Sequence, residues 1–257
     1  MQQQTGPISA SAGRAVLVTG ASSGLGAHFC RLLAKSGYFV IAAARRMTAI
    51  EALVAEIKAA GGQADGVPLD VNDPQSVSTA VAAASALHGG FYGLVNNAGI
   101  ADAARLLDQS VESWDAVHAT NLRGAFLVAQ AAARQMTETG GVIVNVASIL
   151  GLRQGGTLAA YASSKAALVQ LTKQMALEWA RYGIRVNALA PGYFETELNA
   201  AFFATDAGRA MTARVPMRRL GRIEELDAPL LLLISAANSF MTGSVIAVDG
   251  GHLVSGL

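Results

Sequence analysis

Two side chains in the second half of the sequence, Tyr161 and Lys165, have the types and the spacing for acid–base chemistry. Residues at i and i+4 lie on one face of a helix, so a helix starting near Tyr161 would bring the phenol and the ammonium together. A nearby cation favours phenolate and is expected to lower the pKa of the phenol into the range useful for a general acid or base. A surface pair is the alternative interpretation of this spacing.

Ser148 favours the chemical interpretation of that pair. It follows an apolar run at 142–146 that is typical of a buried strand. A hydroxyl at that place would lie at the carboxyl edge of a parallel sheet, where ligands bind in open α/β folds. We therefore expect Ser148, Tyr161 and Lys165 to form one catalytic group.

A second motif with a chemical use is the sequence TGASSGLG at 19–26. Glycine lets the backbone turn sharply and approach a ligand, and the N–H groups of the first helical turn favour a pyrophosphate. A glycine-rich turn without a ligand is the alternative, but the apolar strand before the motif and the helix after it match a dinucleotide site. The missing Gly-Lys-Ser/Thr excludes a Walker A loop. Cofactor contacts are expected from Gly20, Ser22, Ser23, Gly24, Leu25 and Gly26.

The residues after the second apolar run, 39–43, bear on the choice of dinucleotide. An acidic residue there would bind the ribose hydroxyls of NAD, whereas a basic residue would pair with the 2′-phosphate of NADP. Arg45 and Arg46 occupy this place, and guanidinium binds phosphate through paired hydrogen bonds. The sequence predicts a preference for NADP(H), with NAD(H) as the alternative. Arg45 is the stronger candidate, because Arg46 could equally be a solvated surface charge.

Between these motifs the chain alternates short apolar runs with longer helical patterns. Continuous apolar strands separated by helices are typical of a parallel sheet covered on both faces. We predict an α/β fold with a doubly wound parallel (Rossmann) sheet, a flexible tail at 1–13 and a single domain at 14–257. Strands are expected at 15–18, 39–43, 63–69, 93–96, 142–146, 185–189 and 244–248, and helices at 27–35, 48–60, 74–87, 113–136, 161–182 and 223–235.

Composition excludes several classes of protein. With 52% hydrophobic and 14% charged residues in 257, the chain is not intrinsically disordered, and a net charge of +1 gives no footprint for nucleic acid or an anionic membrane. The uncharged run 228–248 is interrupted by polar residues, which argues against a membrane span. A lone cysteine, Cys30, favours a reducing, cytoplasmic location. The four histidines lack metal-ligand spacing, so we expect no catalytic metal. Because the low net charge gives no footprint for nucleic acid or a membrane, we expect a small-molecule partner.

Taken together, the motifs resemble those of the short-chain dehydrogenase/reductases. The resemblance implies an oxidoreductase that transfers a hydride between NADP(H) and a carbonyl compound or secondary alcohol. It extends over nearly the whole chain from about Arg14. It rests on TGASSGLG at 19–26, LDV at 69–71, NNAG at 96–99, Asn121, Ser148, YASSK at 161–165, PG at 191–192 and VDGG at 248–251.

The resemblance also implies roles for single residues. Tyr161 would protonate the carbonyl oxygen in reduction and act as the base in the reverse direction. Lys165 would lower the pKa of Tyr161 and bind the nicotinamide ribose, and Ser148 would hydrogen-bond the substrate oxygen. Asn121 would hold a water of the proton relay, unless it is an ordinary polar residue of its helix. Further cofactor contacts are implied for Asp70, Val71, Asn97, Ala98, Gly99, Pro191, Gly192, Phe194 and Thr196.

The substrate is the least defined part of this prediction. Residues at about 193–216 are expected to form a lid over it, or else a helical pair packed on the sheet. A sugar or polyol dehydrogenase using NAD and a 3-oxoacyl thioester reductase are alternatives within the family. An inert dinucleotide-binding protein is disfavoured because the catalytic pair is present. Substrate contacts are expected from Ser148, Leu150, Tyr161, Tyr193 and Leu198.

Two of the expected helices, at 113–136 and 161–182, are apolar over wide arcs. One face of a sheet cannot cover all of this surface, which indicates contacts between subunits. Relatives in the resembled family commonly pair through these two helices. We therefore expect a homotetramer or a homodimer.

Overall fold

The computed structural model of the protein describes residues 13–195 and 200–255. Thr196 and Leu198, which we expected to contact cofactor and substrate, lie outside the described residues, as does most of the expected N-terminal tail. Residues 14–255, apart from that internal gap, contain every element discussed below.

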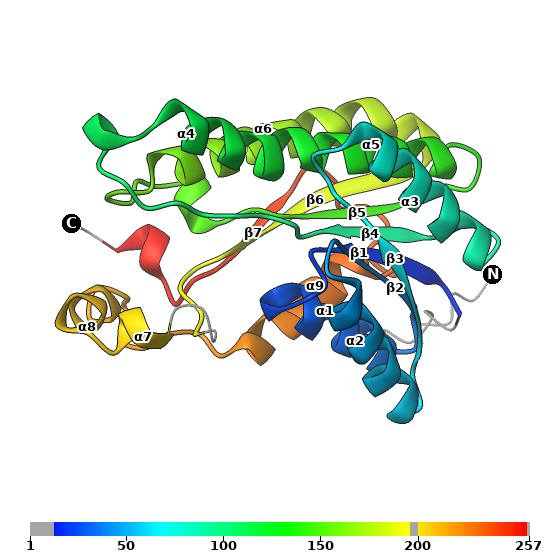
Figure 1. Cartoon of the computed structure of the whole chain (residues 1–257), viewed down its shortest axis with the longest axis horizontal. Coiled ribbons are helices and arrows are strands. Elements are labelled where there is room, and N and C mark those ends of the chain that lie inside the picture. Colours follow the sequence, from blue (N-terminus) through cyan, green and yellow to red (C-terminus); the bar gives the residue numbers. More distant parts are fainter. Residues whose placement is uncertain (1–12, 196–199, 256–257) are drawn as a thin grey trace.

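Seven parallel strands form one sheet in the order β3-β2-β1-β4-β5-β6-β7 (Figure 1). Successive strands are added on one side of β1 up to β3 and then on its other side from β4 onward. The crevice between β1 and β4, where the side changes, is the usual ligand site of doubly wound sheets. The predicted Rossmann architecture is confirmed. The strands are β1 (Ala15–Thr19), β2 (Phe39–Ala44), β3 (Gln63–Pro68), β4 (Gly93–Asn96), β5 (Gly141–Val146), β6 (Ile184–Pro191) and β7 (Val245–Val248).

Helices cover both faces of the sheet (Figure 1). Strand β1 shows why its apolar run is continuous: Val16 and Val18 belong to the core on one face, and Ala15 and Leu17 to the core on the other. One layer contains α1 (Gly24–Lys35), α2 (Met47–Ala59) and α9 (Asp227–Ile234). The other contains α3 (Pro74–Leu87), α4 (Val111–His118), α5 (Ala125–Met136) and α6 (Ala159–Trp179), while α7 (Ala200–Phe203) and α8 (Asp206–Thr212) stand apart near the C-terminal segment.

The helix predicted at 113–136 is not continuous. A π-helical turn, Ala119–Gly124, separates α4 from α5. The side chain of Asn121 in this turn bonds to the backbone of Ile100, and a Cβ on Gly124 would lie 2.8 Å from Val71 Cγ2. Contacts with two loops thus fix the turn, and π-helical turns are frequent at functional sites.

The apolar run 228–248 is divided between two elements. Its first part forms α9, where Leu230 and Leu233 are buried in the core, and its last part forms the edge strand β7. Among the described helices, none combines the length and the apolar character needed to cross a membrane.

Candidate active site

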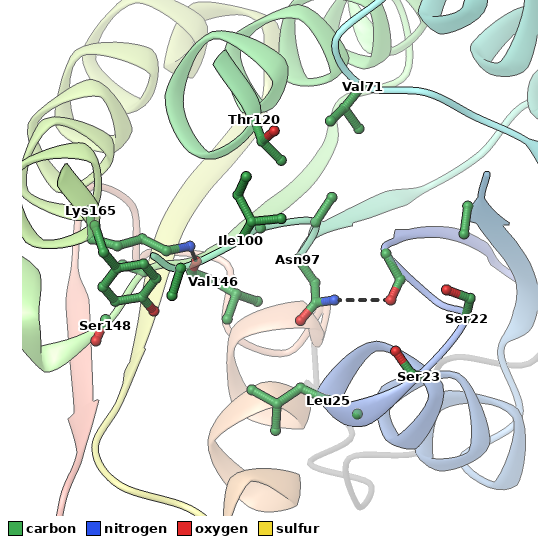
Figure 2. Close-up of a pocket in the computed structure, with 18 of the residues that line it drawn as sticks. Ser22, Ser23, Leu25, Val71, Asn97, Ile100, Thr120, Val146, Ser148 and Lys165 are labelled. Atoms are coloured by element: carbon green, nitrogen blue, oxygen red, sulfur yellow. Dashed lines mark hydrogen bonds between the residues drawn. The ribbon is translucent and has the colours of Figure 1, made fainter. Parts of the chain in front are cut away.

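A cleft of about 780 Å³ lies at the carboxyl ends of the central strands. This volume is within the usual range for small-molecule sites. One end contains residues of the loop between β1 and α1, and the other contains Ser148, Tyr161 and Lys165. Figure 2 shows Ser22 and Ser23 on one side and Ser148 and Lys165 on the other, with Asn97 and Ile100 between them.

The loop between β1 and α1 presents open backbone to the cleft. Ser23 is the N-cap residue of α1, but its side chain does not cap the helix. A Cβ on Gly24, which lines the cleft, would meet no atom within 4 Å. N–H groups of an uncapped first turn favour an anion. Gly20, Ser22, Ser23, Gly24 and Leu25 line the cleft as predicted.

Gly26 lies where α1 packs against the loop. It is buried and is not among the cleft residues. A Cβ there would collide with the backbone oxygen of Gly20 and lie 2.7 Å from Asn97 Nδ2. The residue therefore allows α1 to pack closely against the loop, and its contact with a cofactor stays a prediction.

Asn97 holds the loop in place from the neighbouring strand. Its Nδ2 donates hydrogen bonds to the backbone oxygens of Gly20 (3.4 Å; Figure 2) and Thr19 (3.0 Å). Its backbone N–H donates to Thr19 Oγ1 (2.9 Å). Asn97, Ala98 and Gly99 also line the cleft. The structural and the cofactor-binding interpretations of NNAG are therefore compatible.

Both arginines after β2 line the cleft and are exposed. Arg46 Nη2 donates to Ser22 Oγ (3.0 Å) and Ser23 Oγ (3.1 Å). We expected Arg45 to be the stronger candidate, but Arg46 is the one bonded to the loop. Asp70 and Val71, at the end of β3, line the same end of the cleft.

The other end of the cleft combines the three predicted catalytic side chains. Ser148 follows β5, and its Oγ accepts a hydrogen bond from the Leu150 N–H (3.1 Å), which leaves its own proton available for donation. Tyr161 and Lys165 lie on the first turns of α6, with Lys165 Nζ 5.7 Å from the centre of the Tyr161 ring. Lys165 Nζ also donates to the backbone oxygen of Val146 (2.7 Å; Figure 2).

Burial dominates the protonation of this group. It raises the pKa of Tyr161, although the hydrogen bond with Ser148 acts in the opposite direction. Burial also lowers the pKa of Lys165, from 10.5 to about 8. Burial is the larger of the two effects on Tyr161, and the lowering of its pKa by Lys165 stays a prediction.

Known proteins share this sequence and architecture. The family model described as Enoyl-(Acyl carrier protein) reductase matches residues 20–252. The gluconate 5-dehydrogenase of Gluconobacter oxydans (strain 621H) is 38% identical over 245 residues, covering 95% of this chain and 96% of that protein. The solved short-chain type dehydrogenase/reductase from Mycobacterium marinum is 39% identical, with a TM-score of 0.88 over 94% of this chain and 96% of that one. The chain belongs to the short-chain dehydrogenase/reductase family.

A second solved member resembles the structure still more closely. The gluconate 5-dehydrogenase from Burkholderia cenocepacia J2315, in complex with NADP and tartrate, has a TM-score of 0.92 and 38% identity, covering 95% of this chain and 97% of that one. With the family shown, the protein is an oxidoreductase of the alcohol and carbonyl class.

In this short-chain dehydrogenase/reductase, Asn121 lies behind the cleft rather than in it. The residue is fully buried and bonds to both the N–H and the backbone oxygen of Ile100 (2.8 Å each) and to Ser164 Oγ (3.1 Å). Its Oδ1 and Lys165 Nζ both face Gly99, where a Cβ would lie 3.2 Å and 3.5 Å from them. The side chain thus fixes the wall beside Lys165, and its contact with a relay water stays a prediction.

The predicted substrate contacts separate into two groups. Tyr193 lines the cleft together with Pro191, Gly192 and Phe194. Its ring packs against Phe203 (6.0 Å between ring centres) and His252 (5.2 Å). Leu150, in contrast, is buried and is not among the cleft residues, and its substrate contact stays a prediction.

Ile100, Thr120 and Asn72 are among the cleft residues that sequence reasoning missed. Ile100 and Thr120 line the middle of the cleft, and Asn72 donates to Thr120 Oγ1 (3.2 Å) beside them. Asn72 directly follows the LDV motif, and this position at a strand end was the available signal. Thr120 belongs to the π-helical turn, which no local pattern indicated. Among the described residues, histidines, cysteines and carboxylates do not gather into a group that could hold a metal.

Proposed function

We propose that the protein transfers a hydride between NADP(H) and a secondary alcohol or its carbonyl counterpart, with Tyr161 as the general acid and base. The observation that carries this proposal is the placement of Ser148, Tyr161 and Lys165 at one end of a cleft whose other end is the open first turn of α1. A dinucleotide long enough to span the cleft would bring its reactive end to these three side chains.

The residues present fit such a cofactor. The uncapped first turn of α1 would hold the pyrophosphate. Asp70 and Val71 would contact the adenine, and Lys165 the ribose next to the nicotinamide. Arg46, bonded to the hydroxyls of Ser22 and Ser23, supports a site for the 2′-phosphate, with Arg45 beside it. The NADP bound by the Burkholderia cenocepacia relative supports the same preference.

The bound cofactor supplies or accepts the hydride. During reduction, negative charge develops on the substrate oxygen, and Tyr161 Oη would donate its proton to that oxygen. The Ser148 hydroxyl would donate a hydrogen bond to the same oxygen. Because burial raises the pKa of Tyr161, the phenol is protonated at neutral pH, which is the state required of the acid. In the oxidation direction, the same group must lose its proton, so oxidation should be faster at higher pH.

Hydroxy acids and polyols are the first substrates to test, because two of the relatives described above are gluconate 5-dehydrogenases. The 3-oxoacyl-[acyl-carrier-protein] reductase of Thermotoga maritima, which is 37% identical to this chain, supports 3-oxoacyl thioesters as the second candidate. The aromatic wall formed by Tyr193 suits an apolar portion of either substrate.

Initial rates of NADPH oxidation with ketones, aldehydes, keto-sugar acids and 3-oxoacyl thioesters, and of NADP⁺ reduction with gluconate, test the proposal. NADH and NAD⁺ are run in parallel. Tyr161→Phe and Ser148→Ala should each lower kcat by about a hundredfold or more, because each removes a group that acts on the transition state. Tyr182→Phe, in the exposed 3-10 helical turn that follows α6, is the matched control and should keep full activity. Full activity in Tyr161→Phe would refute the mechanism.

We also propose that the protein is a cytoplasmic homotetramer, with a homodimer as the alternative. Exposed apolar side chains on α5 and α6, among them Phe126 and Leu177, support a subunit contact there. The single cysteine, Cys30, is buried, which suits a reducing compartment. Light scattering should give four or two times the 26.4 kDa mass of one chain. A monomer at micromolar concentration would remove the proposal on assembly.

A further inference from the structure

Four polar side chains form a line through the interior of the molecule. They come from four different elements: Thr19 from β1, Asn96 from β4, Asn145 from β5 and Thr172 from α6. Thr19, Asn145 and Thr172 are fully buried, and Asn96 is 2% exposed. Burying a polar group costs free energy unless hydrogen bonds replace its contacts with water. We therefore expect these four side chains to do more than fill the core.

Each member of the line donates a hydrogen bond to the next. Thr19 Oγ1 donates to Asn96 Oδ1 (3.4 Å), and Asn96 Nδ2 donates to Asn145 Oδ1 (3.2 Å). Asn145 Nδ2 then donates to Thr172 Oγ1 (2.9 Å), which in turn donates to the backbone oxygen of Leu168 (2.8 Å). The shared direction of donation fixes how both amide groups are oriented.

The bond between Asn145 and Thr172 joins β5, which ends shortly before Ser148, to α6, which contains Tyr161. Asn145 is followed on β5 by Val146, whose backbone oxygen accepts the hydrogen bond from Lys165 Nζ. Lys165 and Thr172 lie two turns apart on the same face of α6, since seven residues separate them. Two adjacent residues of β5 thus hold α6 at two separate points. A helix held in this way can neither slide along the strand nor rotate against it.

This attachment determines how the catalytic side chains meet. Ser148 lies just beyond the end of β5, and Tyr161 lies one turn before Lys165 on α6. The position of α6 along β5 therefore sets the separation between Tyr161 Oη and Ser148 Oγ. Near-attack geometry tolerates little displacement, and a shift of about 1 Å can cost about a hundredfold in rate.

We propose that Asn145 and Thr172 are positioning residues for proton transfer: their hydrogen bond fixes α6 on β5 and holds Tyr161 against Ser148. The expected effect on proton transfer rests on the proposed function of Tyr161, whereas the expected effect on the separation between Tyr161 and Ser148 does not. The proposal also explains why an amide and a hydroxyl occupy a fully buried contact that two apolar side chains could fill.

Thr172→Val tests the proposal, because it keeps the shape of the side chain and removes the hydroxyl. Thr172→Ser is the conservative variant that restores the hydroxyl. Ala176→Gly, one turn further along α6, is the matched control, since it destabilises the same helix without touching the bond. Crystal structures, thermal unfolding and kinetic constants are compared for all three and the wild type. The kinetics use the substrate that the wild type turns over fastest.

In Thr172→Val we expect Tyr161 Oη to move out of hydrogen-bonding distance of Ser148 Oγ. We expect kcat to fall about tenfold, equivalent to about 1.4 kcal/mol, while the KM for the cofactor changes less than about twofold. The pH profile of oxidation should move to higher pH, because Tyr161 loses the interaction with Ser148 that favours phenolate. Thr172→Ser should restore all three properties. Ala176→Gly should lower the unfolding temperature and leave the Tyr161–Ser148 separation, kcat and the pH profile unchanged.

An unchanged Tyr161–Ser148 separation in Thr172→Val would overturn the proposal, as would a loss of kcat in Ala176→Gly equal to that in Thr172→Val. Should Thr172→Val fail to fold, Thr172→Ala carries the same comparison. The crystal structures show whether the Asn145–Thr172 bond sets the separation between Tyr161 and Ser148, even if no substrate is found. A failure of this proposal can therefore be distinguished from a failure of the proposed function.

Discussion

Lys165 Nζ donates a hydrogen bond of 2.7 Å to the backbone oxygen of Val146, the last residue of β5. The side chain is only 4% exposed, and burial is the cause of its lowered pKa of about 8. The ammonium group therefore titrates much closer to neutral pH than an ordinary lysine does.

This lowered pKa predicts a specific dependence of stability on pH. Between about pH 8 and 10.5 the unfolded chain binds the proton of Lys165 more tightly than the folded protein, so stability rises with pH across this range. Relative to Lys165→Met, the wild type should gain about 2 kcal/mol in the free energy of unfolding between pH 8 and pH 10. Urea unfolding of both proteins at the two pH values measures the difference.

The comparison with Lys165→Met removes the contributions of all other titrating groups. Tyr161 acts in the opposite sense only above its ordinary pKa of 10, because burial raises that pKa. A difference in unfolding free energy that stays constant from pH 8 to pH 10 would show that the pKa of Lys165 is not lowered.

The two arginines after β2 should contribute unequally to the binding of NADPH. Arg46→Ala removes the guanidinium that bonds to Ser22 and Ser23, and should raise the KM for NADPH about tenfold, with little effect on NADH. Arg45→Ala should have a smaller effect in the same direction. Steady-state kinetics with both cofactors provide the measurement, and equal effects on NADPH and NADH would contradict the assignment of the 2′-phosphate site.

Two glycines of the loop between β1 and α1 should respond differently to alanine. In Gly26→Ala the added Cβ meets the backbone of Gly20, so part of the loop must move, at a cost of about 3 kcal/mol in unfolding free energy. In Gly24→Ala the Cβ meets nothing, and the cost of about 1 kcal/mol comes from its positive φ of 53°. Denaturant unfolding distinguishes them, and equal losses would mean that the close approach at Gly26 is absent.

Asn121→Leu should be strongly destabilising. The change removes both hydrogen bonds to the Ile100 backbone and the bond to Ser164, and should lower the unfolding free energy by about 3 kcal/mol. Ser164→Ala keeps both bonds between Asn121 and Ile100; it removes the bond from Asn121 to Ser164 Oγ and the one from Ser164 Oγ to the backbone oxygen of Tyr161, and should cost about 1 kcal/mol. If both variants unfold at the same denaturant concentration, the contact with Ile100 does not hold the cleft wall.

Much of the fold could be predicted because burial on both faces leaves a clear pattern in the strands. The alternating membership of Ala15 to Val18 in two cores requires an uninterrupted apolar run, and such a run is visible in the sequence. The π-helical turn at Ala119–Gly124 was not predictable, because it depends on contacts with Ile100 and Val71, which are distant in sequence.

The site was predictable in its residue types and less so in its energetics. The spacing of Tyr161 and Lys165 indicates that the two side chains share a helix face, but the degree of burial, which decides both pKa values, depends on the packed structure. The preference for Arg45 over Arg46 stays a prediction, and only the fold shows that the Arg46 guanidinium is the one that bonds to the serines of the loop.

The bonds from Arg46 to Ser22 and Ser23 have a further consequence for recognition. The two hydrogen bonds hold the guanidinium in place, so part of its conformational entropy is lost on folding and not on binding. A phosphate group that binds there meets a preorganised site. The guanidinium then donates its hydrogen bonds to the phosphate oxygens in place of water and the serine hydroxyls. The preference for NADP(H) over NAD(H) should therefore appear mainly as a slower dissociation of NADP(H), which carries the additional 2′-phosphate.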